Sequence, residues 1–143
     1  MMAETGRPLR IAVAGAGAAD RELAAAAEEV GRRIAEAGAV LLCGGLGGVM
    51  EAAARGCVEA GGLTIGILPG GDAGAASPHI RVPIPTGLGE ARNVLVARGG
   101  DVVIAIGGEW GTLSEVALAR KVGVPVVLLR PGLTAGLGLT VAE

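Results

Sequence analysis

Aromatic side chains are almost absent from this chain of 143 residues, which has one tryptophan, Trp110, and neither tyrosine nor phenylalanine. Proteins that bind single-stranded nucleic acids usually stack the bases on such rings. The net charge is -2, and no basic cluster is larger than Arg32-Arg33. The positive surface that attracts a phosphate backbone is therefore missing too. We expect no nucleic-acid partner and a core built from alanine and aliphatic residues.

Cysteine, histidine and lysine are also scarce. The two cysteines, Cys43 and Cys57, form neither a disulfide framework nor a metal-ligand pattern. The single histidine, His79, leaves no set of ligands for a metal and argues against a Ser–His–Asp triad. The single lysine, Lys121, is not part of a Gly-Lys-Ser/Thr motif, which excludes a P-loop. We therefore expect no metal site.

No apolar run reaches the length of about 18 residues that a membrane helix needs, and no signal peptide begins the chain. We therefore expect a cytoplasmic protein without a membrane partner. A hydrophobic content of 51% with 18% charged residues is typical of a folded globular domain. We expect a flexible tail over residues 1–8 and one domain over residues 9–143. Residues 131–143 are not assigned.

Apolar runs that suit buried strands alternate along the chain with segments of helical periodicity. This alternation predicts a single doubly wound, Rossmann-like α/β domain with a mostly parallel sheet. Asp20 is a candidate N-cap for the first helix, and Gly38 would end it. The expected strands are 9–14, 39–43, 63–68, 101–106 and 125–129, with a short one at 80–84; the other expected helices are 49–59, 89–98 and 112–122.

The abundant residue is glycine, with 27 copies, and many of them follow the expected strands. Four glycine-rich turns, at 15–17, 44–48, 69–71 and 107–111, come after strands that would run in the same direction. In a doubly wound sheet, ligands bind beyond the carboxyl ends of the strands. The sequence therefore predicts that these turns surround one crevice, with 69–71 more structural than binding because no clear helix follows it.

The first turn resembles a dinucleotide fingerprint only in part. In Gly15-Ala-Gly17-Ala-Ala-Asp20, an aspartate replaces the third glycine. The second strand ends in Cys43-Gly44-Gly45, where a carboxylate for the ribose belongs. Dinucleotide binding is therefore disfavoured, and Gly15 and Gly17 are interpreted as a tight turn that can still contact a ligand.

The segment 107–115, Gly-Gly-Glu-Trp-Gly-Thr-Leu-Ser-Glu, has two interpretations. Its glycines and a helix N-terminus near Thr112 would form a phosphate cradle without a lysine. Alternatively, Thr112 and Glu115 form a capping box, S/T-x-x-E, with no chemistry. A second cradle after the second strand would favour a phosphorylated ligand of nucleotide size. The residues of the two cradles are Gly107, Gly108, Gly111 and Thr112, and Gly44, Gly45, Gly47 and Gly48.

Three motifs together resemble the LONELY GUY phosphoribohydrolases: the 107–115 segment, the turn from Gly44 to Met50, and Glu90-Ala-Arg92-Asn93. The similarity covers about residues 9 to 130. It implies a homodimer or homotetramer that hydrolyses the N-glycosidic bond of a nucleoside 5′-monophosphate, releasing base and ribose 5-phosphate without a required cofactor. It also implies that Arg92 and Glu115 are the catalytic pair, that the 107–112 cradle holds the phosphate, and that Asn93 and Trp110 are further ligand contacts.

The departures from that family point to a second branch. Ile106 stands in place of the family's proline, Asn93 in place of its lysine, and the 107–112 motif is one residue longer. In these features the chain is similar to molybdenum cofactor carrier proteins. That resemblance implies a non-catalytic carrier or sensor whose cradle holds a phosphate-bearing ligand: a nucleotide, phosphate itself or molybdenum cofactor. The sequence leaves turnover and the identity of the ligand open.

Overall fold

The computed structural model describes residues 4–132 and 134–142 and contains one sheet of seven strands, in the order β4-β3-β2-β1-β5-β6-β7. Every strand pair is parallel, so the expected doubly wound α/β fold is confirmed. The strands are β1 Arg10–Gly15, β2 Val40–Cys43, β3 Thr64–Leu68, β4 Val82–Pro85, β5 Val102–Ile106, β6 Val126–Leu129 and β7 Thr140–Ala142.

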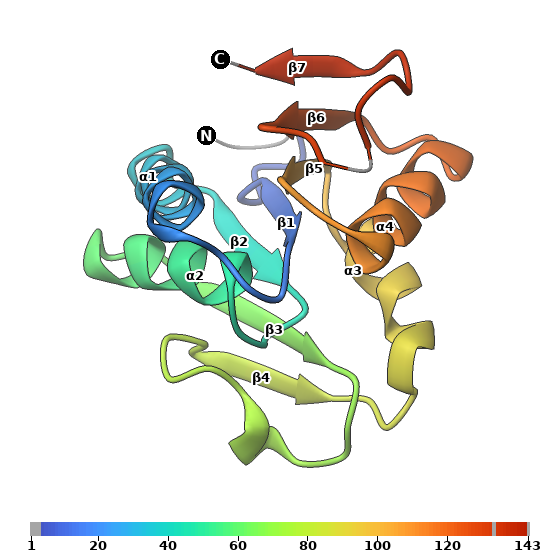
Figure 1. Cartoon of the computed structure of the whole chain (residues 1–143). Helices are drawn as coiled ribbons and strands as arrows, with labels where there is room; N and C mark the ends of the chain where they lie inside the picture. Colours follow the sequence, from blue (N-terminus) through green and yellow to red (C-terminus); the bar gives the residue numbers. More distant parts are fainter. Residues whose placement is uncertain (1–3, 133, 143) are drawn as a thin grey trace.

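Helices cover both faces of the sheet (Figure 1). α1 (Arg21–Glu36) and α2 (Val49–Glu59) lie on one face, and α3 (Asn93–Gly99) and α4 (Trp110–Lys121) lie on the other. Two 3-10 turns, η1 (Ala73–Ala75) and η2 (Gly89–Arg92), lie in the connections. The core accordingly has two apolar layers, one centred on the fully buried Val13 and Val49 and the other on Val103 and Val116.

The two helices on the first face cross at two glycines. A Cβ atom on Gly31 would overlap the carbonyl oxygen of Ala53, and one on Gly56 would overlap the carbonyl oxygen of Glu28. The absence of both side chains lets the two backbones touch. The first helix begins as expected, because the Asp20 carboxylate accepts a hydrogen bond of 2.8 Å from the N–H of Leu23.

Two sequence-based expectations about the elements need correction. The expected helix 89–98 is divided into η2 and α3. The strand at 126–129 is not the last, because β7 pairs with β6 in parallel. β7 is exposed along its whole length, so it lacks the apolar pattern by which buried strands are found. Residues 1–3 of the expected tail and residue 143 lie outside the described residues.

Candidate functional site

A cleft of about 460 Å³ opens at the carboxyl ends of the central strands, where the glycine turns meet. Its volume suits a ligand of nucleotide size. Figure 1 shows the turns that follow β1, β2, β3 and β5 at this edge of the sheet. The expected convergence is confirmed. The lining residues are Gly15, Ala16, Gly17, Leu46, Met50, Pro69, Glu90, Arg92, Asn93, Glu109, Trp110, Gly111, Thr112 and Glu115.

The N-terminus of α4 forms one wall of the cleft. Its first backbone hydrogen bond runs from the N–H of Leu113 to the carbonyl of Glu109, at 2.9 Å. The N–H groups of the three residues before Leu113 therefore lie at the open, positive end of the helix. A Cβ atom on Gly111 would have no side chain and no backbone of another segment within 4 Å, so the backbone here is open to a ligand.

The capping-box interpretation of this helix is wrong. The N-cap is Glu109, whose side chain makes no capping hydrogen bond, and Thr112 lies inside the first turn. Since the helix begins two residues earlier than expected, Glu115 lies beyond the reach of a capping box. Both Thr112 and Glu115 are buried and line the cleft.

Glu115 and Arg92 line the same cleft, as the resemblance implied. Burial raises the pKa of Glu115 from 4.5 to about 7, and the nearby Arg92 guanidinium lowers it in part. The buried Arg92 Nη1 donates a hydrogen bond to Oδ1 of Asn93. Its Nε, also buried, has no hydrogen-bond partner among the described residues. The cleft thus contains a guanidinium with an unused donor beside a carboxyl that titrates near neutral pH.

The glycines of the turn after β2 contact neighbouring protein atoms. A Cβ atom on Gly44 would lie 2.8 Å from Nη2 of Arg92, so this glycine lets the guanidinium pack against the backbone. A Cβ atom on Gly45 would lie 2.7 Å from the Leu68 side chain, and one on Gly48 would overlap the backbone of the first turn. As direct ligand contacts, Gly44, Gly45, Gly47 and Gly48 stay a prediction. Leu46 of this turn and Met50, at the start of α2, line the cleft.

The turn after β5 contains two glycines with positive φ, 62° at Gly107 and 120° at Gly108. L side chains rarely adopt such angles, so both glycines are required by the backbone path. The N–H of Gly107 donates to the carbonyl of Leu129 at 2.9 Å, which fixes the turn to β6. As phosphate contacts Gly107 and Gly108 also stay a prediction, while Gly111 borders the cleft directly.

Several lining residues were not among the candidates from the sequence, Pro69 and Glu90 above all. Pro69 follows β3 at the ligand edge, in a turn that we interpreted as structural. Glu90 begins the Glu90-Ala-Arg92-Asn93 motif, of which Arg92 and Asn93 were the expected site residues. Trp110, which was a candidate, lies at the edge of the cleft with 75% of its surface exposed.

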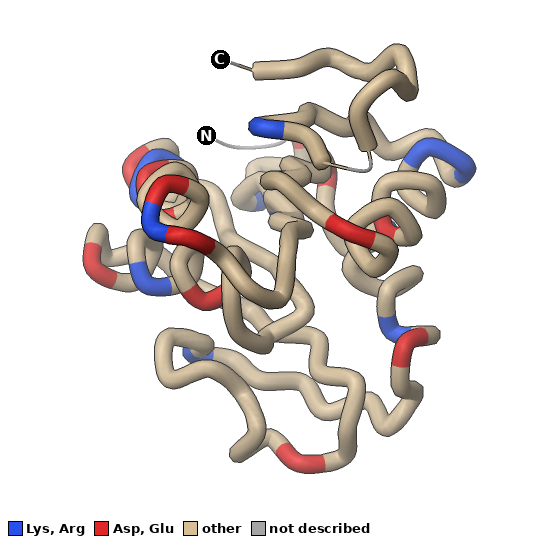
Figure 2. The backbone as a smooth tube through the Cα atoms, viewed as in Figure 1, with Lys and Arg blue, Asp and Glu red and all other residues tan. Residues whose placement is uncertain are grey.

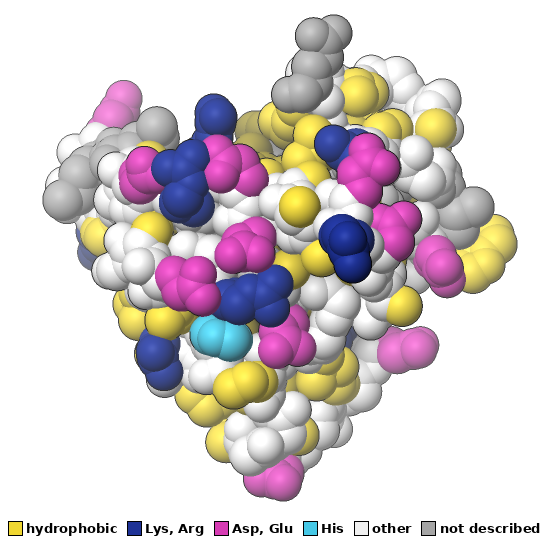
Figure 3. Space-filling model, turned by 60° about the vertical axis from the view of Figure 1, so that its left-hand side comes forward, with side chains coloured by type: hydrophobic (Ala, Val, Ile, Leu, Met, Phe, Trp, Pro, Cys, Tyr) yellow, Lys and Arg dark blue, Asp and Glu magenta, His cyan; other side chains and the backbone are white. Residues whose placement is uncertain are grey.

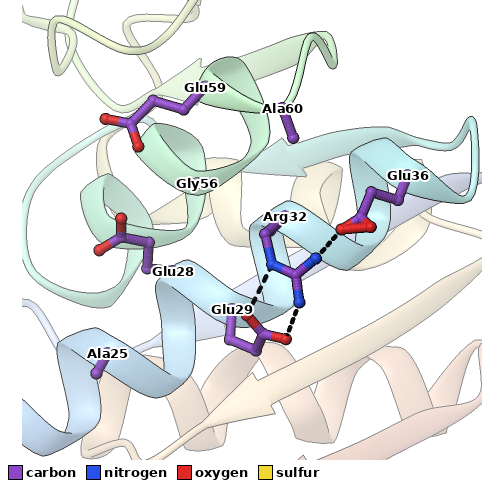
Figure 4. Close-up of a pocket in the computed structure, with 8 residues that line it drawn as sticks. All are labelled: Ala25, Glu28, Glu29, Arg32, Glu36, Gly56, Glu59 and Ala60. Atoms are coloured by element: carbon purple, nitrogen blue, oxygen red, sulfur yellow. Dashed lines mark hydrogen bonds and ion pairs between the residues drawn. The ribbon is translucent and has the colours of Figure 1, made fainter.

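A second hollow lies between α1 and α2 (Figure 4). Arg32 forms ion pairs there with Glu29 and Glu36, and Glu28 pairs with Arg55 at 3.2 Å. Figure 3 shows basic and acidic side chains interspersed over this side of the molecule. Because these charges pair with one another at an exposed surface, the hollow is a solvated helix face rather than a ligand site.

Within 4–132 and 134–142, no group of three or more His, Cys, Asp or Glu side chains could hold a metal ion. In the same part of the chain, no helix is both long and apolar enough to cross a membrane. Figure 2 shows how the charged residues are spread along the backbone.

Fold and cleft together define a Rossmann-like α/β protein whose ligand edge is built from glycine turns. The chain belongs to the SLOG cluster4 family, whose model matches residues 8–141. It is 45% identical over 123 residues to an uncharacterized protein of Archaeoglobus fulgidus. The aligned segment covers 86% of this chain and 81% of that protein.

Two solved structures are similar to nearly the whole chain. The first is the molybdenum cofactor binding protein from the phototrophic bacterium Rippkaea orientalis, with a TM-score of 0.90 and 43% identity over 96% of this chain and 90% of that one. The second is the molybdenum cofactor carrier protein of Chlamydomonas reinhardtii, with a TM-score of 0.87 and 40% identity over 96% of this chain and 91% of that one. The resemblance to molybdenum cofactor carrier proteins that the sequence indicated is confirmed.

Proposed function

We propose that this protein is a carrier of molybdenum cofactor and holds the cofactor's phosphate at the N-terminus of α4. The observation that carries the proposal is the open α4 end in a cleft of about 460 Å³. The likeness to two structures named for molybdenum cofactor, each over 96% of this chain, supports it. The expected homodimer or homotetramer stays a prediction.

The residues of the cleft fit a phosphate in three ways. The α4 N–H groups and helix dipole favour an anion. The bare backbone at Gly111 permits close approach, since no side chain and no other segment would lie within 4 Å of a Cβ there. The buried Nε of Arg92 has no hydrogen-bond partner among the described residues and is a donor suited to phosphate oxygens.

Filling the space above Gly111 tests this placement. Gly111→Leu adds a side chain where no side chain and no other segment would contact its Cβ, so the fold is retained and the cleft is obstructed. We expect binding at least about tenfold weaker, equivalent to about 1.4 kcal/mol. Molybdenum cofactor released from a denatured molybdenum enzyme is mixed anaerobically with the protein, and bound molybdenum is measured after gel filtration.

The matched control is Ala117→Leu, at an exposed position further along the same helix and outside the cleft. It should retain molybdenum like the native protein. If Gly111→Leu retained as much molybdenum as the native protein, the phosphate would not be bound at this end of α4. Absence of bound molybdenum in the native protein would reject the carrier.

A phosphoribohydrolase is the second candidate, and the Glu115–Arg92 pair favours it. Hydrolysis of an N-glycosidic bond develops positive charge on the ribose, which a carboxylate stabilises while it orients a water. Glu115, with its pKa of about 7, would be ionised in about half of the molecules at neutral pH. Arg92 would hold the phosphate or the ribose.

Release of ribose 5-phosphate separates the two candidates. For the carrier we expect none from adenosine or guanosine 5′-monophosphate, with no difference between the native protein and Glu115→Gln. A hydrolase would release it, and Glu115→Gln would lower the rate by about two orders of magnitude or more, the usual size of a lost acid–base or electrostatic group. Release by the native protein alone would therefore overturn the carrier proposal.

A further inference from the structure

The two ends of the cleft differ chemically. The β5 end is formed by Glu109 and the first turn of α4, which offers backbone N–H groups. The sheet order places β3 and β2 on the other side of β1, so their turns form the opposite end. There the partly buried Leu46, Met50 and Pro69 line the cleft and supply apolar surface. The Arg92 guanidinium packs against Gly44 beside them.

Glu90 lies at this same end of the cleft. It lies in η2, whose first residue, Gly89, donates its N–H to the carbonyl of Pro69 at 2.9 Å. The Glu90 side chain is exposed and lines the cleft. Among the described residues no ion pair or hydrogen bond neutralises its carboxylate, so both of its oxygens are available to accept hydrogen bonds from a ligand.

The charges of the cleft are a poor match for a ligand that is only an anion. Among the described residues, three carboxyl groups line it beside one guanidinium, that of Arg92. Glu90 and Glu109 are exposed carboxylates, and Glu115, with its pKa of about 7, is partly ionised at neutral pH. The guanidinium of Arg92 nevertheless leaves its buried Nε without a hydrogen-bond partner among the described residues, and an acceptor group of a ligand would satisfy it. A ligand that satisfies both observations carries a phosphate at one end and a cluster of N–H donors at the other.

We propose that the Glu90 carboxylate recognises the 2-amino-4-oxo-pyrimidine edge of the ligand. Pterins and guanine share this edge, which presents a ring N–H beside an amino group. This inference rests on the proposed function, because the phosphate at α4 directs the ring toward Glu90. A carboxylate accepts from the ring N–H and the adjacent amino group at once. Adenine has a ring acceptor at the equivalent place, and the uracil N–H lies between two carbonyls. Either base would therefore place an acceptor against an oxygen of the carboxylate.

Nucleoside 5′-monophosphates that differ only in the base test whether Glu90 recognises this edge. We expect isothermal titration of the native protein to give binding at least about tenfold tighter for GMP than for IMP, which lacks only the 2-amino group, since a hydrogen bond to a charged group is worth about that much. AMP and UMP should bind no better than IMP. Glu90→Gln should reduce the GMP preference to less than about threefold, because its amide presents a donor to a donor.

Glu109→Gln is the matched control, since it removes a carboxylate from the phosphate end of the same cleft. It should leave the ratio of GMP to IMP affinity unchanged. Equal affinity for GMP and IMP, or a preference that survives Glu90→Gln, would overturn the inference and leave phosphate binding intact. Failure of all four nucleotides, with molybdenum cofactor still retained, would also overturn it. Failure of the nucleotides and of the cofactor together would instead reject the proposed function.

Discussion

Gly56→Ala is expected to lower the free energy of unfolding by about 3 kcal/mol, although alanine is the better helix former by about 1 kcal/mol. The added Cβ would overlap the carbonyl oxygen of Glu28 in α1, a backbone atom that cannot rotate away. α1 and α2 would have to separate along a crossing that covers the buried Ala27, Ala53 and Cys57. Urea unfolding measures the loss, and the Tm should fall by roughly 10 °C.

Gly111→Ala is the control, because it makes the same substitution in a helix with no side chain and no other segment within 4 Å of the new Cβ. Its stability should be equal to or slightly above that of the native protein. If Gly56→Ala were as stable as Gly111→Ala, the helices would tolerate separation, and the close crossing would not be a requirement of the fold.

The central fold could be predicted because it depends on local patterns. The apolar runs that form β1, β2, β3, β5 and β6 consist mostly of buried and half-buried residues, and sequence periodicity detects such runs. β7 could not be found in this way, since its three residues are exposed and only pairing with β6 orders them. The crossing at Gly31 and Gly56 was equally hidden, because a glycine inside a helix gives no sign of which backbone approaches it.

The location of the candidate site could also be predicted, because parallel strands bring their carboxyl ends to one edge. The details depended on three-dimensional contacts. Thr112-x-x-Glu115 fits a capping box in the sequence, but α4 begins at Trp110. Because of this earlier start, Glu115 does not cap the helix; it is buried and lines the cleft. Glu90 could have been recognised only through the hydrogen bond from Gly89 to Pro69, which joins two distant turns.

The stability of the protein should depend on pH through Glu115. The pKa of Glu115 is 4.5 in the unfolded chain and about 7 in the folded protein, because burial opposes the charged form. Below about pH 4.5 the carboxyl is protonated in both states and has no effect. As the pH rises from 4.5 to 7, the unfolded chain releases its proton first, so the folded state loses stability, by about 3 kcal/mol at pH 8.

Glu115→Gln removes this titration, so its stability relative to the native protein should rise by about 3 kcal/mol between pH 4.5 and pH 8. Urea unfolding of both proteins at several pH values in this window measures the difference. Other groups, such as the exposed Glu29 with its pKa of about 2, act equally in both proteins and cancel. A difference that does not change with pH would mean that Glu115 ionises in the folded protein as it does in water. The Arg92 guanidinium would then fully offset its burial, and the cleft would hold a permanent carboxylate opposed to any anionic ligand.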